Sequence, residues 1–280
     1  MPAVAVELFT KCVELAVARN AEFVPPHDSR AFLYIRPVMF AGGSHIALSP
    51  ARMYTLCVFV TPATAPPPGI SLRALIVEQF DRTAPKGCGS KKVGGNYAPV
   101  MQYVESAKDQ GYSITIHLDS LTGLQVEEFA SCAFVAVREG SAEPALVIPD
   151  SRNVLHSTTV RAIEALWKEK GWKVERRPVS SSLQWTFLGI WLNSCQIYVS
   201  ELSSFTEVMA VGTASGIISI ASITQDSVPK TVNYDVAAGG PARYAKEWTV
   251  DLDAIHHGIV PDRFGWLYQI LPISNVDGSS

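Results

Sequence analysis

Short runs of β-branched and aromatic residues, separated by glycine and proline, are the feature that most constrains the fold of this chain. These runs have the length and composition of β-strands, and they outnumber the segments whose apolar residues recur at helical spacing. A doubly wound parallel sheet needs a helix after nearly every strand, whereas here several strands follow one another between single helices. The order of the segments therefore predicts an α+β fold.

Helices are predicted where apolar residues recur at helical spacing, over residues 6–19, 97–110 and 158–170. The first helix must end before Pro25 and Pro26, which cannot continue it, and Gly111 supplies an end for the second. Ser157 is a suitable N-cap for the third helix, and Gly171 ends it.

Strands are predicted at the β-branched and aromatic runs, which are residues 32–40, 53–60, 72–78, 113–118, 126–137, 172–179, 207–211 and 217–223. The first three of these runs are expected to form one three-stranded region. The stretch 81–90 contains Pro85, Gly87 and Gly89 and has the composition of a linker. We therefore expect a small domain over residues 1–80 and a large domain over residues 91–280, joined by this linker.

Composition and charge exclude several classes of function. The chain has 280 residues, 48% of them hydrophobic, which is ample for a core, and its net charge of −3 is spread without a basic patch. Nucleic acid and anionic membranes are therefore not expected as partners. No apolar run is long enough for a membrane span, and Met1 is not followed by a signal sequence, so we expect a cytoplasmic protein. The five cysteines form no CxxC pair and no metal-ligand spacing, so we expect reduced thiols and no metal.

Residues 90–100, which read SKKVGGNYAPV, carry the strongest chemical signal in the chain. A lysine forms an imine with an aldehyde only when its amine is deprotonated and held in place. Two adjacent glycines allow the backbone to come close to a bulky ligand. A bare KKxGG string also fits an ordinary surface turn, so the longer string must decide between the two interpretations.

The longer string resembles the cofactor-lysine segment of the branched-chain amino acid aminotransferases, which are fold-type IV enzymes that use pyridoxal phosphate. The resemblance implies that Lys92 is the Schiff-base lysine and that Lys91 is only its neighbour. It also implies that the Tyr97 hydroxyl lies near the phenolic oxygen of the cofactor. The resemblance covers most of residues 4–268 and implies the family's fold, here with a partial small domain followed by a larger β-rich domain.

Glu128, in the segment QVEEFASCAF at 125–134, matches the glutamate that the family places at the ring nitrogen of the cofactor. A carboxylate there keeps the nitrogen protonated, which makes the ring an electron sink. Alternation along a strand is expected to turn Glu127 to the opposite face. Residues 130–133 differ from the family's pattern, and without the resemblance two adjacent glutamates would fit a solvated strand edge.

The resemblance also implies residues that bind the cofactor phosphate. Thr158 and Thr159 open a predicted helix, where unpaired N–H groups and the helix dipole favour an anion. Their segment, LHSTTV at 155–160, resembles the family's phosphate-binding segment but lacks its proline, glycine and arginine, and a serine cap without a ligand is the alternative. Thr213, in VGTA at 211–214, matches the family's Gly-Thr-Ala turn. That match implies a phosphate contact from Thr213 and backbone N–H groups of Thr213 and Ala214 directed at the substrate carboxylate.

Tyr34 and Arg36 are the candidate substrate-binding residues outside the predicted large domain. They are two positions apart on a predicted strand, so they share a face, and the segment LYIRP at 33–37 resembles the family's Tyr-hydrophobic-Arg-Pro strand. The resemblance implies that this pair faces the substrate. An edge strand with a surface arginine is the alternative interpretation.

Two stretches depart from the family's pattern. The family segment that would precede residue 4 carries small-domain strands and an arginine that binds the cofactor phosphate. We therefore expect this chain alone to be a poor transaminase that holds its cofactor weakly. Residues 179–206 are longer and more apolar than their counterpart, and the alternatives for them are a substrate lid, a dimer contact and retained intron sequence.

The resemblance implies a homodimeric enzyme that uses pyridoxal phosphate to transfer an amino group between a branched-chain amino acid and 2-oxoglutarate. Its small-molecule partners would then be an amino acid and a 2-oxo acid. Two other functions remain open. One is a racemase, lyase or cyclase that keeps the cofactor and acts on a specialised metabolite, and the other is a non-catalytic remnant.

Overall fold

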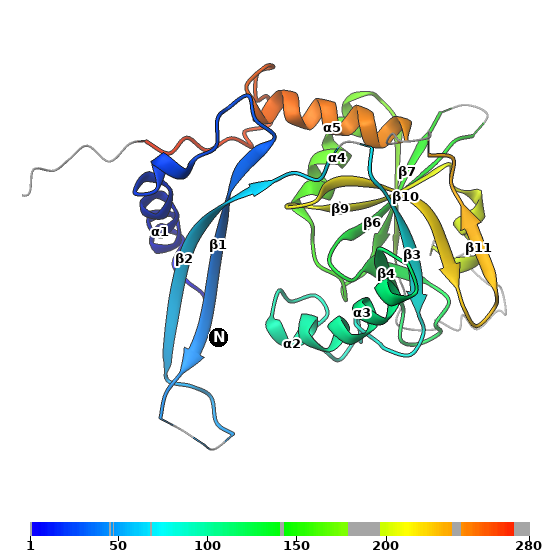
Figure 1. Ribbon diagram of the computed structural model, residues 1–280, viewed down its shortest axis with the longest axis horizontal. Coiled ribbons are helices and arrows are strands. Elements are labelled where there is room, and N and C mark those ends of the chain that lie inside the picture. The colour runs from blue at the N-terminus through cyan, green and yellow to red at the C-terminus, as the bar shows by residue number, and fades with distance from the viewer. Residues whose placement is uncertain are drawn as a thin grey trace, which may run out of the picture. The chain divides into compact units, whose positions relative to one another are not determined.

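A computed structural model of the protein describes residues 2–44, 46, 48–67, 69–140, 143–178, 197–236 and 242–271 (Figure 1). Contacts group the chain into two compact units, Met1–Ala65 with Ile255–Ser280, and Pro66–Ala254. The predicted small domain (residues 1–80), linker (81–90) and large domain (91–280) stay a prediction. Most of the departing stretch, residues 179–196, lies outside the described residues.

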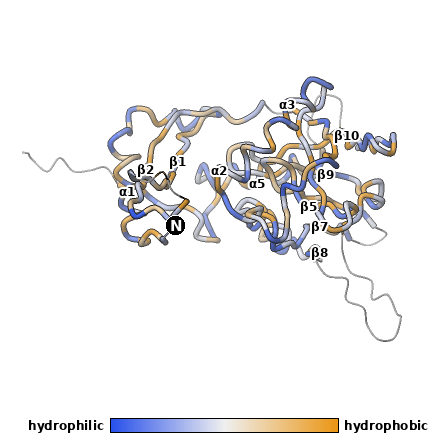
Figure 2. Tube along the Cα trace, turned by 90° about the horizontal axis from the view of Figure 1, so that it is seen from below, coloured by the Kyte–Doolittle hydropathy of each residue, from blue (hydrophilic) through white to orange (hydrophobic). Residues whose placement is uncertain are grey.

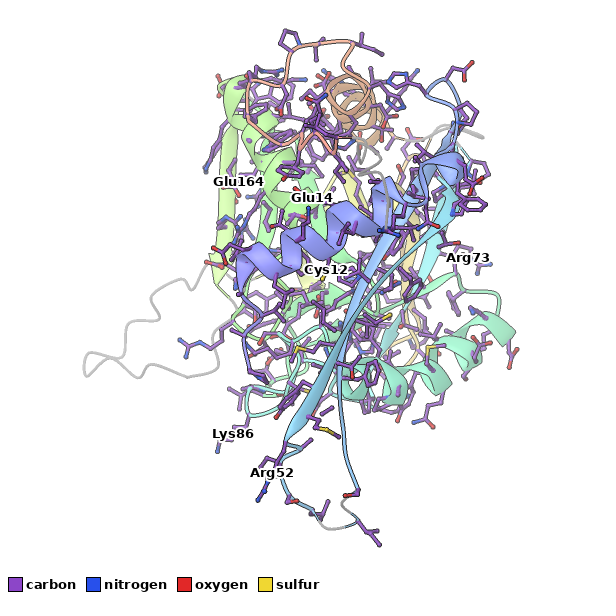
Figure 3. All side chains as sticks on the ribbon, turned by 90° about the vertical axis from the view of Figure 1, so that its left-hand side faces the viewer. Cys12, Glu14, Arg52, Arg73, Lys86 and Glu164 are labelled. Carbon is purple, nitrogen blue, oxygen red and sulfur yellow. The ribbon has the colours of Figure 1, made fainter. Side chains whose placement is uncertain are left out.

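The first unit contains a helix and a long hairpin. The helix α1 (Val6–Ala18) is followed by the short 3₁₀ helix η1 (Ala21–Phe23) and packs against the antiparallel strands β1 (Ala31–Gly42) and β2 (Met53–Thr64). Glu14 of α1, labelled in Figure 3, accepts a hydrogen bond of 2.5 Å from the Tyr268 hydroxyl. None of the residues described between 2 and 65 is fully buried.

The second unit is built on a closed six-stranded β-barrel. Its strands are β3 (Ser71–Val77), β4 (Ile114–Leu118), β5 (Val126–Phe129), β6 (Ala133–Arg138), β9 (Glu207–Gly212) and β10 (Gly216–Gln225). The ring closes because β9 pairs with both β6 and β10. β3 runs parallel to β4 and β10, and the other neighbours in the ring are antiparallel.

The sheet continues beyond the ring on both sides. The strands β7 (Ala145–Asp150) and β8 (Lys173–Pro178) extend it from β6, and β11 (Lys230–Asn233) extends it from β10. Side chains such as Ile116, Phe134 and Ile220, each at most 1% exposed, pack together into the core of this unit. The burial of these apolar side chains supplies the free energy that holds the barrel closed. Figure 2 colours the same chain by hydropathy.

Helices join and cover the strands of the second unit. α2 (Gly94–Tyr97), η2 (Ala98–Val100) and α3 (Met101–Asp109) follow one another without a break, and α3 packs against β4. α4 (Thr158–Glu169) packs against β8 and β9, and η3 (Val199–Ser204) precedes β9. α5 (Arg243–His256) meets α4 where the rings of Trp167 and Trp248 lie 5.1 Å apart. Within the described part of the chain, no helix combines the length and the apolar composition that a membrane crossing requires.

The predicted α+β class is confirmed, and so are the three predicted helices to within a few residues at their ends. The expected three-stranded region is wrong: β1 pairs with β2, whereas β3 lies in the barrel between β4 and β10. Four consecutive residues of β3, Ala74 to Val77, are buried, and a strand covered on both faces belongs inside a sheet. The predicted strand 126–137 is divided at residues 130–132 into β5 and β6, and β7, β11 and α5 were not predicted.

Candidate active site

The loop before α2 holds Lys92 next to Tyr97. Asn96 is buried, and its side-chain amide donates to the carbonyl oxygens of Gly89 at 2.9 Å and Lys91 at 3.2 Å. These bonds tie the loop to the first turn of α2. The Lys92 Nζ atom donates to the Tyr97 hydroxyl at 2.8 Å, while the Lys92 side chain stays exposed. The amine is therefore oriented and accessible, as a nucleophile must be.

Glu128 lies on β5 and forms a buried ion pair with Arg82. The two residues are 3% and 4% exposed. The guanidinium carbon of Arg82 also lies 5.3 Å from the centroid of the Tyr97 ring. Arg82 therefore links Glu128 to Tyr97, which contacts Lys92. The structure thus brings together three residues that the sequence analysis singled out.

Burial raises the pKa of Glu128 to about 7, because it penalises the charged carboxylate. Arg82, the backbone N–H of Leu155 and the charge of Lys92 all act in the opposite direction. A further positively charged donor beside Glu128 would lower this pKa and favour the carboxylate. A cationic group of a ligand beside Glu128 would therefore be stabilised by its carboxylate.

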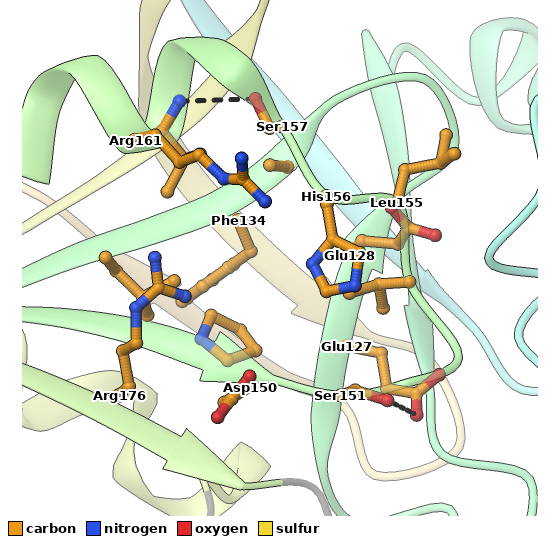
Figure 4. A pocket seen from close by; sticks show the side chains of 15 residues that line it. Glu127, Glu128, Phe134, Asp150, Ser151, Leu155, His156, Ser157, Arg161 and Arg176 are labelled. Atoms are coloured by element: carbon orange, nitrogen blue, oxygen red, sulfur yellow. Dashed lines mark hydrogen bonds between the residues drawn. The ribbon is translucent and has the colours of Figure 1, made fainter.

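The start of α4 lies close to Glu128. The Ser157 hydroxyl accepts a hydrogen bond of 3.2 Å from the Val160 N–H and so caps the helix, as predicted. Thr158 and Thr159 occupy the first two positions, where backbone N–H groups have no acceptor within the helix. Leu155, only two residues before Ser157, lies beside Glu128, and its backbone N–H acts to lower the pKa of Glu128. A pocket lined by Glu128, Leu155 and Ser157 lies at this point (Figure 4).

Thr213 and Ala214 lie exposed in the turn between β9 and β10. This turn contacts the turn between β5 and β6, since the Cys132 Sγ atom lies 3.4 Å from the Ser215 hydroxyl. Cys132 is four residues after Glu128 on the chain, so the Gly-Thr-Ala turn is at the end of the barrel where β5 ends. No hydrogen bond joins Thr213 to the Lys92–Tyr97–Arg82–Glu128 group within the described residues, and its phosphate role stays a prediction.

Tyr34 and Arg36 lie on β1, in the first unit. The guanidinium carbon of Arg36 is 4.9 Å from the centroid of the Tyr34 ring, so the two side chains share a face as predicted. Their role in substrate binding stays a prediction.

Sequence reasoning missed Arg82, which lies in the stretch interpreted as a linker. Its neighbours there include Asp81 and Lys86, which are exposed, and nothing in the local sequence sets Arg82 apart from them. Only its burial against Glu128, 46 positions further along the chain, identifies it. Ser151 and Asn153, which bind Glu127, were missed for the same reason.

Comparison with known proteins identifies the family of this chain. Residues 2–223 match the family described as amino-transferase class IV. An aminotransferase of Gibberella zeae is 40% identical over 99% of this chain and 68% of its own length. The branched-chain amino acid aminotransferase gloG of Glarea lozoyensis is 37% identical over 95% of this chain and 70% of its own length. The chain thus spans about two thirds of the length of these relatives.

Solved structures show the same fold at low sequence identity. A branched-chain amino acid aminotransferase of Escherichia coli superimposes with a TM-score of 0.70 and 22% identity, over 96% of this chain and 77% of the other. The branched-chain amino acid aminotransferase of Thermobaculum terrenum, in its PLP-form, gives a TM-score of 0.67 at 22% identity, over 92% of this chain and 73% of the other.

Proposed function

Because the chain belongs to the class IV aminotransferases, we propose that it binds pyridoxal phosphate and transfers the amino group of a branched-chain amino acid to 2-oxoglutarate. The observation that carries the proposal is the continuous group formed by Lys92, Tyr97, Arg82 and Glu128. The branched-chain name of one relative supports the choice of substrate.

The described residues fit this cofactor. It requires a reactive amine, a carboxylate for the ring nitrogen and donors for a phosphate, and Lys92, Glu128 and the start of α4 are of these three kinds. Glu128 is buried with a raised pKa, so it gains from a cationic partner. A Cβ atom added at Gly94 or Gly95 would meet no atom within 4 Å, which leaves room for a ligand beside Lys92. When bound, the cofactor supplies a ring that withdraws electrons from the substrate Cα.

Each side chain then has a proposed task. Lys92 holds the proton removed from the substrate Cα, and Tyr97 orients the Lys92 amine. Glu128 binds the ring nitrogen, and Arg82 favours the ionised form of Glu128. The backbone N–H groups of Thr158 and Thr159 bind the phosphate.

Further contacts are proposed from the family's pattern. Thr213 adds a hydroxyl to the phosphate site, and the backbone of Ala214 faces the substrate carboxylate. Tyr34 and Arg36 are proposed to bind the substrate. We also propose a homodimer, because Val6, Phe40 and Phe59 of that unit are 72%, 51% and 49% exposed.

The test is to add pyridoxal phosphate to the purified protein, reduce it with borohydride and map the labelled peptide. We expect the label on Lys92, and we expect Lys92→Ala to lose it. Lys91→Ala is the matched control, because Lys91 is the adjacent lysine and is also exposed, and it should keep the label. A label on Lys91, or on neither lysine, would refute the assignment.

The reaction is tested separately with leucine and 2-oxoglutarate, by following glutamate formation. Wild type should form glutamate and Lys92→Ala should not. A protein labelled at Lys92 that forms no glutamate from any branched-chain amino acid would instead support racemase, lyase or cyclase chemistry. A protein that takes no label would support the non-catalytic alternative.

A further inference from the structure

Glu127, next to Glu128 on β5, is buried and bonded to a different part of the chain. Its Oε1 atom accepts hydrogen bonds from the Ser151 hydroxyl at 3.0 Å and the Asn153 side-chain amide at 3.1 Å. The residue is 1% exposed, and its Oε2 atom has no hydrogen-bond partner among the described residues. Figure 4 shows the bond from Ser151. A buried carboxylate is costly, so its retention here needs a reason.

The residues that Glu127 binds begin the loop 151–157, between β7 and α4. Ser151 and Asn153 are 3% and 7% exposed, and the Ser151 hydroxyl also accepts from the Asn153 backbone N–H at 3.1 Å. A Cβ atom added at Gly89 would lie 2.6 Å from the Asn153 carbonyl oxygen, so this loop is packed closely against the segment that leads to Lys92. Glu127 therefore anchors the first half of the loop through Ser151 and Asn153.

The second half of the same loop reaches the site. Leu155 lines the same pocket as Glu128, and Ser157 caps α4, whose first N–H groups belong to Thr158 and Thr159. A loop of seven residues, held at residues 151 and 153, leaves Leu155 little freedom to move away from Glu128.

We propose that Glu127 is a positioning residue, which acts through the loop 151–157 to hold Leu155 beside Glu128 and the start of α4 at the cofactor phosphate. This rests on the proposed function of the site. Glu127 itself needs only to accept two hydrogen bonds, and a glutamine oxygen accepts them equally well. Burial raises the pKa of Glu127 to about 7, which agrees with a side chain that works without its charge.

The test compares Glu127→Leu with Glu127→Gln in the full chain. We expect Glu127→Leu to weaken binding of pyridoxal phosphate by roughly tenfold to a hundredfold, the loss that follows when hydrogen bonds to charged groups are misplaced. Glu127→Gln should bind within about twofold of wild type. Binding of pyridoxal, which lacks the phosphate, should fall less in Glu127→Leu than binding of pyridoxal phosphate. The exposed Glu105 of α3 supplies the control Glu105→Leu, which should change neither affinity.

Hydrogen exchange of the cofactor-free protein gives a second readout that does not depend on the proposed function. Amides of residues 153–157 should exchange faster in Glu127→Leu than in wild type, and at the wild-type rate in Glu127→Gln. If Glu127→Leu fails to fold, Asn153→Ala and Ser151→Ala each remove one of the two donors and should each show a smaller effect in the same direction.

The outcomes separate the two proposals. One outcome is that the wild-type protein binds no cofactor at Lys92 while hydrogen exchange in the loop still depends on residue 127. That result would refute the proposed function and leave the anchoring role of Glu127 intact. Normal cofactor binding and unchanged loop exchange in Glu127→Leu would overturn the inference alone. Impairment of Glu127→Gln equal to that of Glu127→Leu would also overturn it, because the charge and not the hydrogen bonds would then matter.

Discussion

Arg82 shows at the residue scale how one buried charge depends on another. It is 4% exposed and its guanidinium is paired with Glu128, which is equally buried. Removing one partner of a buried ion pair leaves the other charge without compensation. Arg82 thus has a structural role in the cofactor-free protein as well as its proposed effect on Glu128.

We predict that Arg82→Met lowers the free energy of unfolding by about 3–5 kcal/mol in urea denaturation of the cofactor-free protein. Arg152→Met, at an exposed arginine, should change it by less than about 0.5 kcal/mol. The double variant Arg82→Met/Glu128→Leu should recover most of the loss, because it leaves no unpaired charge. A double variant no more stable than Arg82→Met would contradict this account.

Glu127 and Glu128 should make stability depend on pH. Burial raises the pKa of each to about 7 in the folded protein, from an ordinary value of 4.5. A raised folded pKa contributes stability that is complete below about pH 4.5 and is lost as the pH rises through about 7. His117 has the opposite effect. Burial lowers its pKa from an ordinary value of 6.5 to about 4, so the stability of the folded protein falls as the pH drops below about 6.5.

The contribution of Glu127 is therefore best measured as a difference between two proteins. Between about pH 5 and pH 8, wild type should lose stability relative to Glu127→Gln by an amount on the order of 2 kcal/mol. Urea denaturation of the cofactor-free proteins at several pH values gives this difference. Parallel curves for the two proteins would mean that Glu127 does not titrate in this range.

At the scale of elements, the site depends on how two loops pack against each other. The segment before α2 carries Gly89, and the loop before α4 carries Asn153. A Cβ atom at Gly89 would lie 2.6 Å from the Asn153 carbonyl oxygen and 2.9 Å from the Thr83 Cα atom, closer than such contacts allow. Only glycine therefore lets the two loops approach so closely.

We predict that Gly89→Ala lowers the free energy of unfolding by about 1–3 kcal/mol, because backbone on both sides must shift. Gly140→Ala is the matched control, since a Cβ atom there would meet no atom within 4 Å. It should be neutral, or stabilising by about 0.4–1 kcal/mol, because alanine has less conformational freedom than glycine in the unfolded chain. Thermal or urea denaturation measures both variants, and equal stability of the two would refute the packing argument.

At the scale of the whole molecule, the two units have very different cores. The second unit closes a barrel around side chains such as Ile116, Phe134 and Ile220. In the first unit, the two-stranded hairpin β1–β2 and α1 contain no fully buried residue among those described from 2 to 65. A two-stranded hairpin with little burial is only marginally stable in water.

We predict that native-state hydrogen exchange divides the chain along these lines. Amides of β1 and β2 should exchange with opening free energies of only a few kcal/mol, whereas those of β4, β6 and β9 should approach the free energy of global unfolding. Mass spectrometry of peptides from the two units, at increasing urea, measures both. Equal protection throughout would show that the first unit gains its stability elsewhere.

The sequence by itself was enough to determine the α+β class, the helices at α1, α3 and α4, the Ser157 cap and, from the segment around Lys92, the resemblance to the aminotransferase family. These features depend on the spacing and composition of residues that are close together in the sequence, so they can be predicted from the sequence alone. Alternation along β5 also predicted that Glu127 and Glu128 face apart, and the two bind different partners in the structure.

Only the tertiary structure decided which distant residues meet. Closure of the barrel through β9 took β3 away from the hairpin β1–β2 and brought Arg82, in a stretch with the composition of a linker, against Glu128. It also placed Ser151 and Asn153 on Glu127. Local sequence patterns cannot identify such partners. A charged residue that becomes buried can have the same kinds of sequence neighbours as one that stays exposed, and the two differ only in the distant residues that the fold brings beside them.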